Sequence, residues 1–211
     1  MNVGMVRDGE LTSPVSRSKV SPERVTASYP FLPPLSTATD VSENENRASA
    51  YAVRAIAPED RTAVAAIVRD RWGDAGIVIL GRLHEPDALQ GFVAVDRDDA
   101  TIVGLLIRRD EGENETVIVT LDLVGSDEEI GTALLDTLKE EGKGKGWYRM
   151  RAVTTNDNRT MQSFYQKHGF RLTAIHGDSV TGARALAPSI PEFGEGNVPM
   201  RDELEYEWRG E

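Results

Sequence analysis

Apolar and polar residues alternate in the stretch YAVRAI, over residues 51–56, which is the pattern of a strand with one buried face. Pro58 follows, and its fixed backbone angle suits the first turn of a helix. A helix is therefore predicted over residues 58–72, where apolar side chains recur at helical spacing at Val64, Ile67 and Val68. The pattern assigns no element to residues 73–90.

Three apolar runs then come close together, at residues 91–95, 101–107 and 116–124. The two segments between them, DRDDA and RRDEGENE, are polar and rich in turn residues. Short polar connections of this kind join antiparallel neighbours, so the three runs predict an antiparallel meander.

The rest of the chain changes repeatedly between helical and strand patterns. A helix marked by three apolar residues at helical spacing runs to the glycine-broken segment EEGKGKG; these residues are Ile130, Leu134 and Leu138. The later predicted elements are a strand over 149–155, a helix over 156–170, and strands over 171–175 and 204–208. A meander followed by strand, helix and strand predicts an α/β (α+β) fold: a mixed, mostly antiparallel central sheet with helices on both faces.

Residues 1–50 differ in composition from the remainder. They hold twelve Ser or Thr and five of the ten prolines, and their apolar runs are short and aperiodic. Such a segment cannot bury enough apolar surface to offset the entropy lost on ordering. We therefore expect a disordered N-terminal extension over residues 1–50 and one folded domain over residues 51–211.

Charge and cysteine content narrow the classes of partner. The formal net charge of -11 repels phosphate backbones, so no nucleic-acid partner is expected, and cationic or neutral small partners are favoured. The chain has no cysteine, which excludes disulfides, thiolate metal sites and Cys nucleophiles. No apolar run reaches the roughly 18 residues of a membrane span. We expect a cytoplasmic monomer or homodimer with no metal and no membrane association.

The segment NDNRTMQSFYQKHGF, over residues 156–170, carries the clearest family signal. It resembles the second cofactor motif of the GNAT superfamily of acetyl-CoA-dependent N-acetyltransferases, with its matching positions at Asn158, Met161, Phe164, Tyr165, Gly169 and Phe170. A second similarity is IGTALLDTL, which looks like the helix that opens after the family's pyrophosphate loop. The resemblance covers about Tyr51 to Trp208. It implies a GNAT-like domain that uses acetyl-CoA as co-substrate and acetylates a small-molecule or protein amine.

The resemblance gives Tyr165 the role of general acid. Transfer of an acyl group from a thioester leaves a thiolate, and a tyrosine hydroxyl beside the sulfur can protonate it. Asn158 would contact the pantetheine or phosphate arm, Phe164 would pack inward, and Gly169 would end the helix in the left-handed conformation. The alternative is that Tyr165 is only a core aromatic residue with a satisfied hydroxyl.

A transferase of this kind also needs a base, because an ammonium has no lone pair with which to attack. Alternation along residues 116–124 puts Thr120 and Asp122 on one face and Val119, Leu121 and Leu123 on the other. The family often places its base on this strand, so Asp122 is the candidate, activated by partial burial. The alternative is an aspartate on a solvated strand face.

Histidines and one tryptophan complete the candidates. In the resembled family the segment after the first helix forms the acceptor side, which makes Trp72 and His84 candidate substrate contacts. His168 lies in the last turn of a helix, where a cation complements the helix dipole, and a structural role is expected for it. Nothing near His176 completes a metal-binding set.

The predicted pyrophosphate loop departs from the family pattern. Where the family usually has glycines whose free amides hold the phosphates, this chain has SDEE and keeps only Gly131. Ser126 and Glu129 form a capping box there, and three carboxylates disfavour a further anion. This leaves a catalytically degenerate binding or regulatory module as the alternative function. The remaining candidate cofactor contacts around this loop are Leu123, Val124, Ile130 and Thr132.

Overall fold

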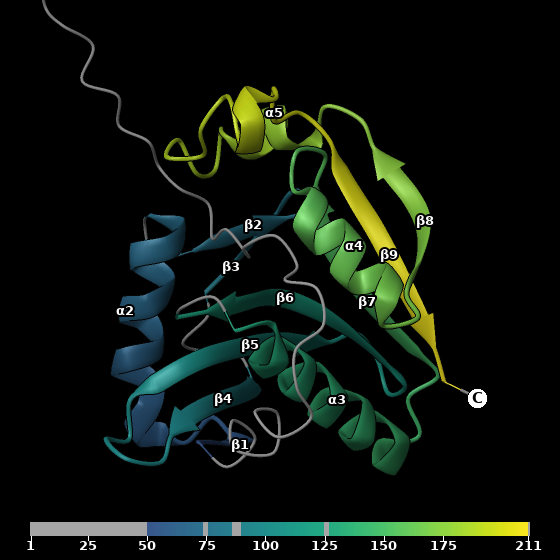
Figure 1. Cartoon of the computed structure of the whole chain (residues 1–211). Helices are drawn as coiled ribbons and strands as arrows, with labels where there is room; N and C mark the ends of the chain where they lie inside the picture. The colour runs from purple at the N-terminus through teal and green to yellow at the C-terminus, as the bar shows by residue number, and fades with distance from the viewer. Residues whose placement is uncertain (1–49, 74–75, 86–89, 125–126, 211) are drawn as a thin grey trace, which may run out of the picture.

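The computed structural model describes residues 50–73, 76–85, 90–124 and 127–210. Its centre is a seven-stranded sheet, shown in Figure 1. In spatial order the strands are β1 (Tyr51–Ala55), β4 (Gln90–Asp96), β5 (Ile102–Asp110), β6 (Glu115–Leu123), β7 (Arg149–Thr155), β9 (Glu203–Arg209) and β8 (Arg171–His176). The predicted extension lies outside the described residues, apart from residue 50.

All neighbouring strands in this sheet are antiparallel except β6 and β7, which run parallel. The prediction of a mixed, mostly antiparallel sheet is therefore confirmed. Four α-helices accompany it in the described part of the chain: α2 (Arg61–Trp72), α3 (Glu128–Lys145), α4 (Arg159–Lys167) and the short α5 (Ser179–Ala183). A single turn of 3-10 helix, Pro58–Asp60, precedes α2, and another lies at Glu195–Asn197. None of these helices combines the length and the apolar character that a membrane span needs, as far as the described residues go.

Two hydrophobic clusters hold the helices on opposite faces of the sheet. On one face Val64 and Val68 of α2 pack against the meander, through Val93, Leu105 and Val117. On the other face α3 and α4 bury apolar side chains against residues from both halves of the sheet; these include Ile118, Leu134, Leu138, Met150, Phe164 and Tyr206. The second cluster therefore joins the two halves of the domain.

The segment that the sequence pattern left unassigned forms a hairpin of β2 (Ile77–Ile79) and β3 (Arg82–His84). Its two turn residues, Leu80 and Gly81, both have positive φ, at 49° and 69°. Leucine rarely adopts this conformation, which is why the turn gave no sequence signal. The amide of Leu80 donates to both carboxylate oxygens of Glu203 on β9, at 3.0 and 3.1 Å, and this fixes the hairpin to the second half of the sheet.

The parallel contact between β6 and β7 is short and ends in the middle of the molecule. It comprises only the four residue pairs from Glu115 with Arg149 to Ile118 with Ala152. At the same level the β5 and β6 register shifts, because Ile107 faces Thr120 while Arg108 faces Ile118. Val119 is thus an extra residue in β6, a β-bulge, and bulges bend and twist a strand. Beyond this point β6 and β7 diverge, and we call the region where they diverge the seam.

The bulge corrects one prediction about the faces of β6. Strict alternation placed Val119 opposite Thr120 and Asp122, together with Leu121 and Leu123. In the structure Val119 packs in the α2-side cluster, the side from which Trp72 contacts Asp122, while Leu121 and Leu123 belong to the other cluster. One inserted residue moves the side chains that follow it in the strand to the opposite faces of the sheet.

The helix of the family motif is shorter than the sequence predicted. It spans Arg159–Lys167, and Asn158 caps it by accepting a hydrogen bond of 3.0 Å from the amide of Met161. Gly169 follows with φ of +83°, so the predicted left-handed glycine is confirmed. The nearby His168 ring contacts the carbonyl of Phe164 at 2.8 Å and the hydroxyl of Thr132 at 3.2 Å, which is consistent with a structural role.

Candidate active site

A cavity opens at the seam, where β6 and β7 have separated. Val119–Leu123 of β6 and Val153–Thr155 of β7 form its walls, and Trp72 closes one side. The space between the atoms amounts to about 890 Å³, part of it open to solvent. Its other lining residues come from α2, β2, the start of α3, α4 and β9, whose positions around β6 and β7 can be followed in Figure 1.

Asp122 lines this cavity and has 1% of its surface exposed. Its Oδ2 accepts hydrogen bonds from the hydroxyl of Thr120 at 2.6 Å and from the indole Nε1 of Trp72 at 3.1 Å. Its Oδ1 is buried and has no hydrogen-bond partner in the described structure. Burial raises the pKa of Asp122, although the two hydrogen bonds and the charge of Arg71 oppose the rise. A carboxylate with one unbound oxygen and a raised proton affinity can accept a proton.

Tyr165 enters the same cavity from α4, and 3% of it is exposed. Its ring is held by aromatic neighbours, with centroid distances of 5.8 Å to Phe164, 5.4 Å to Phe170 and 6.0 Å to Tyr206. No hydrogen bond joins its hydroxyl to another described residue. Burial, followed by the charge of Asp122, raises the pKa of Tyr165, so the phenol keeps its proton at neutral pH.

Four further predicted residues also line the cavity: Leu123, Gly131, Asn158 and Phe164. Asn158 uses its Oδ1 to cap α4, which leaves its side-chain amide without a partner among the described residues. Gly131 has ordinary van der Waals room above it, because a Cβ there would meet the Phe164 ring at 3.5 Å. Together with Trp72, Asp122 and Tyr165, these residues form a single site although they come from four different elements.

Several other predicted residues do not line the cavity. Val124 follows β6 and is 46% exposed, Ile130 is buried in the core against β5, and Glu129 and Thr132 lie on the first turns of α3. Gly104 allows the close approach of this helix, since a Cβ there would come within 2.5 Å of the Ile130 side chain. Ser126 lies outside the described residues.

His84 is also absent from the cavity lining, so this geometry does not support an acceptor contact for it. The residue is buried on β3, and its Nε2 has no hydrogen-bond partner in the described structure. Burial, with the nearby charges of Arg109 and Arg82, lowers the pKa of His84 to about 4. The ring is therefore neutral at physiological pH.

Glu203 is a cavity residue that the sequence did not single out. It is the first residue of β9, it is 3% exposed, and its carboxylate binds the amide of Leu80. Its place in the site depends on β9 lying beside β7, where Glu203 pairs with Thr155. The only sequence signal was a charged residue at the start of an alternating strand, which by itself is common.

Comparison with known proteins assigns the family. A sequence model described as "Acetyltransferase (GNAT) family" matches residues 50–170. The chain belongs to the GNAT acetyltransferase family. An uncharacterized Bacillus subtilis protein, YxbD, is 36% identical over 141 residues, covering 67% of this chain and 87% of that protein.

Solved structures share the GNAT fold at low sequence identity. An IAA acetyltransferase from Bacillus cereus has 17% identity and a TM-score of 0.56, and covers 76% of this chain and 99% of that one. A GNAT family acetyltransferase from Elizabethkingia anophelis, solved with acetyl-CoA bound, has 18% identity and a TM-score of 0.53 over 76% of this chain and 98% of that one. At this level of identity these similarities show that the GNAT chain shares the fold of those proteins, and they assign no site residue.

The start of α3 differs from the predicted capping box. Asp127 caps the helix, and its side chain accepts a hydrogen bond of 3.0 Å from the amide of Glu129. The amide of Ile130 is bound to the Asp127 carbonyl at 3.2 Å. Two of the amides that a phosphate would use therefore already have partners. Asp and Ser are both good caps, so the sequence could not fix the helix start to one residue.

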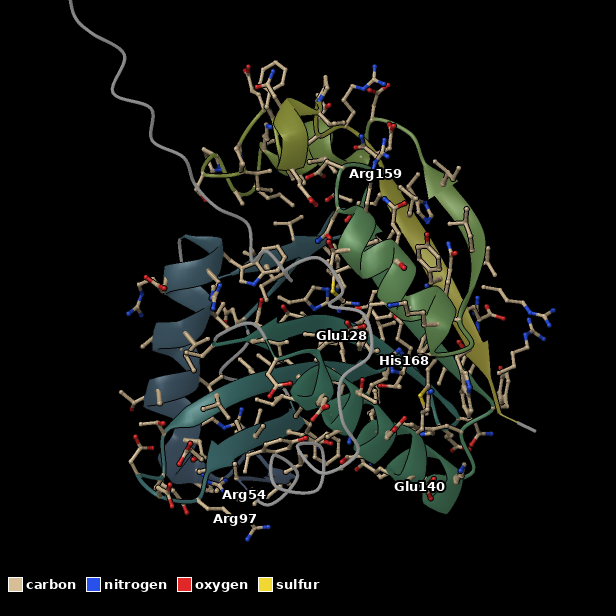
Figure 2. The ribbon with its side chains drawn as sticks, in the orientation of Figure 1. Arg54, Arg97, Glu128, Glu140, Arg159 and His168 are labelled. Carbon is tan, nitrogen blue, oxygen red and sulfur yellow. The ribbon has the colours of Figure 1, made fainter. Side chains whose placement is uncertain are left out.

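Negative charge at this helix start is only partly compensated. Glu128 pairs with Lys167 of α4 at 3.5 Å, and both side chains are substantially exposed. Figure 2 shows Glu128 and His168 near each other between the two helices, with Glu140 far away at the other end of α3. Asn158 and Tyr165, in the cavity, offer polar groups of the kind that could hold the thioester end of acetyl-CoA. The start of α3 is less suited to hold the phosphates, because Asp127 already binds the amide of Glu129.

Proposed function

We propose that this protein transfers the acetyl group of acetyl-CoA to a primary amine, with Asp122 as general base and Tyr165 as general acid. One observation carries the proposal: Asp122, with its unbound Oδ1, and the buried side chain of Tyr165 line one cavity, at the seam between β6 and β7. Membership of the GNAT family supports the reaction class. The two side chains supply opposite proton transfers, as acyl transfer to an amine requires.

Asp122 removes the proton that keeps an amine from reacting. An ammonium entering the cavity meets a carboxylate whose Oδ2 is fixed by Thr120 and Trp72 and whose Oδ1 is unbound. Because burial raises the pKa of this carboxyl group, its proton affinity lies closer to that of an amine than it would in water. The proton moves from the amine nitrogen to the carboxylate, either directly or through one water, and the nitrogen lone pair becomes available.

Tyr165 supplies the second proton transfer. When bound, acetyl-CoA offers a thioester carbon open to attack by the amine, and its C–S bond breaks with the electron pair leaving on sulfur. Tyr165 donates its hydroxyl proton to that sulfur. The nitrogen still carries a second proton after it attacks, and it gives this proton to the tyrosinate as the amide forms, directly or through water, so the one net proton released is that on Asp122. The raised pKa of Tyr165 suits this role, because the phenol is fully protonated before the transfer. The ring contacts with Phe164, Phe170 and Tyr206 hold the hydroxyl in one position.

Charge in the cavity favours a cationic acceptor. Asp122 and Glu203 both contribute carboxylates, and none of the described lining residues is a lysine or arginine. Two carboxylates in a partly buried space attract an ammonium more strongly than they would in water. Trp72 adds an aromatic ring to the same wall, which can also stabilise a cation.

The cofactor would be held by residues along the seam. The side-chain amide of Asn158 is available as a donor, and Leu123, Gly131 and Phe164 offer apolar contacts. We propose weaker phosphate binding than is usual for GNAT proteins, because Asp127 already binds the amide of Glu129. We expect a correspondingly reduced affinity for acetyl-CoA.

The test is an acetylation assay with an unbiased library of primary amines, followed by mass spectrometry of the products and measurement of released thiol. The proposal expects at least one amine to gain an acetyl group in step with thiol release. The Tyr165→Phe and Asp122→Asn variants should lose the activity that the wild-type protein shows. An unchanged rate in both variants would remove the proposed mechanism.

A second function is favoured by one observation, the acidic start of α3. If Asp127, Glu128 and Glu129 prevent binding of the pyrophosphate, the protein is a non-catalytic GNAT module that binds another ligand or partner. Calorimetric titration with acetyl-CoA separates the two functions. Saturable binding supports the transferase, and the absence of heat up to millimolar acetyl-CoA supports the module.

A further inference from the structure

A second, smaller chamber adjoins the reaction cavity on the acceptor side. Four residues line both spaces, so the two are adjacent: Trp72, Val78, Thr155 and Glu203. The space in the second chamber amounts to about 420 Å³, part of it open to solvent. Nothing in the reaction described above uses it.

The walls that belong to this chamber alone are apolar. Val180, Ala183, Ala187 and Met200 are at most 9% exposed, and Ile190 completes this wall. Thr155 and Glu203 are its only polar lining residues in the described structure, and both lie at the junction with the reaction cavity. A molecule extending from the junction would therefore meet no hydrogen-bonding side chain further in.

These walls come from α5 and the segment between β8 and β9, which Figure 1 shows beyond the start of α4. Arg184 fixes the segment by donating to the carbonyls of Ile190 at 3.2 Å and of Met200 at 2.8 Å. Asn156 fixes its end, because its Oδ1 accepts from the amides of Arg201 and Asp202 at 2.9 and 3.0 Å. The chamber is thus built into the fold rather than formed by a closing loop.

We infer that the acceptor is a monoamine whose amine-bearing carbon carries a short apolar group, and that this group occupies the second chamber. The inference rests on the proposed function. Glu203, at the junction, and Asp122, in the reaction cavity, hold the ammonium, and Trp72, which lines both spaces, lies against both the ammonium and the tail of the acceptor. A second charge or a sugar hydroxyl in the tail would be buried without a partner, which is costly. Diamines, amino sugars and extended peptides are therefore poor acceptors.

The experiment measures kcat/KM for n-alkylamines from methylamine to pentylamine, and for 1,5-diaminopentane as a charged counterpart, at fixed acetyl-CoA. Each added CH2 group is expected to raise kcat/KM by about 4-fold until the chamber is full. The diamine should fall at least about 10-fold below pentylamine. Melting temperature with each amine, in the absence of acetyl-CoA, gives a second readout and should follow the same order.

Variants that fill the second chamber test whether the apolar tail of the amine lies there. Ala183→Leu fills the chamber and should stop the rise after the shortest amines while methylamine turnover is kept. Gly182→Ala is the matched control in the same helix, because a Cβ there meets nothing within 4 Å, and it should behave as wild type. Ala187→Leu provides a second filling variant if Ala183→Leu does not fold.

The outcomes separate this inference from the function on which it rests. Acetylation that is independent of tail length, or better with the diamine, would overturn the inference and leave the transferase intact. A rise that persists unchanged in both filling variants would also overturn it, since the tail would then lie elsewhere. If no amine is acetylated, the proposed function fails and the inference fails with it.

Discussion

The indole Nε1 of Trp72 donates a hydrogen bond of 3.1 Å to Oδ2 of Asp122, and so joins the last residue of α2 to a strand 50 residues further along the chain. This contact favours the ionised form of Asp122, because a hydrogen bond to a carboxylate stabilises its charge. The helix that covers one face of the sheet thus adjusts the chemistry of the candidate base.

Trp72→Phe should keep an aromatic ring in the wall and remove the indole donor to Asp122. We expect the pKa of Asp122 to rise further, so that the acidic limb of the pH profile of kcat/KM moves to higher pH. At the acidic end the rate should fall about 3- to 10-fold, which corresponds to one hydrogen bond. Trp208→Phe, on β9 and outside the cavity lining, is the control. A profile that does not move in Trp72→Phe would separate this contact from catalysis.

Tyr165→Phe should lower turnover by roughly 10- to 1000-fold, the range expected for loss of one general acid. The melting temperature should change little, because the hydroxyl has no partner in the described structure that its removal would leave unpaired. Tyr148→Phe is a matched control, since that tyrosine is 50% exposed and outside the cavity. Equal rates for the two variants would mean that Tyr165 only packs.

Asp122→Asn should reduce the rate most at low pH, where free amine is scarce and the base is most needed. The same substitution lowers activity but should help the stability of the folded protein at neutral pH. Because the folded-state pKa of Asp122 is raised above 3.8, the protonated group favours folding at low pH, and this contribution is lost as pH rises through the folded-state pKa. The amide cannot ionise, so the variant should lose less stability than wild type over that rise.

Chemical denaturation across pH checks the stability of this variant, and initial rates across the same range check its activity. Asp136→Asn, on an exposed position of α3, controls for loss of one negative charge. If the pH profile of the rate keeps its shape in Asp122→Asn, then Asp122 is not the base.

Asp127→Asn should tighten acetyl-CoA binding by about 2- to 5-fold, the scale of one removed like charge near the surface. Asparagine caps helices as well as aspartate does, so α3 should keep its stability. Replacing Asp127, Glu128 and Glu129 by Gly, Arg and Gly should tighten binding further, by about 1 to 3 kcal/mol, and should lower the melting temperature as glycines enter the first turn. Calorimetry and thermal denaturation measure the two effects.

Glu140→Gln provides the control for the charge of this helix, because Glu140 lies at the end of α3 away from Glu128 (Figure 2). Its affinity for acetyl-CoA should equal that of wild type. If Asp127→Asn and the triple variant also bind as wild type does, the phosphates do not approach this helix start.

His84 should make the fold sensitive to mild acid. The unfolded chain binds a proton near pH 6.5, whereas the folded ring, with its pKa lowered to about 4, does not. Stability contributed by the neutral ring is complete above pH 6.5 and is lost as pH falls toward 4. His84→Gln should therefore lose about 1 to 2 kcal/mol less than wild type between pH 7 and 4.5. Urea titrations at the two pH values measure this difference, and equal losses would contradict it.

Local patterns were sufficient to predict most of the architecture. Alternation gave the strands of the meander, and the spacing of Ile130, Leu134 and Leu138 gave α3, because both patterns report directly on which side chains are buried. The motif from Asn158 to Phe170 likewise predicted a helix with a capped start and a glycine end. These features depend on residues close together in the chain.

The features that the sequence did not predict depend on distant contacts or on unusual backbone. The hairpin around Leu80 has a turn with positive φ at leucine, held by Glu203 more than a hundred residues later. The bulge at Val119 appears only in the pairing with β5. Glu203 itself joins the site because β9 pairs with β7. A window that covers a single strand contains only one partner of each of these contacts.

At the seam, part of the main chain of β6 and β7 has no neighbouring strand on one side. Where β6 and β7 part after Ile118 and Ala152, their facing main-chain amides and carbonyls no longer bond to each other, in the interior of the protein instead of at its rim. Some of these groups bind elsewhere in the protein: the carbonyl of Leu123 accepts from Arg71, and the carbonyl of Thr155 accepts from Asn158 and Gln162. The ladder between β6 and β7 therefore stops in the middle of the sheet, and side chains and helix ends take over the bonding of the main chain beside the cavity.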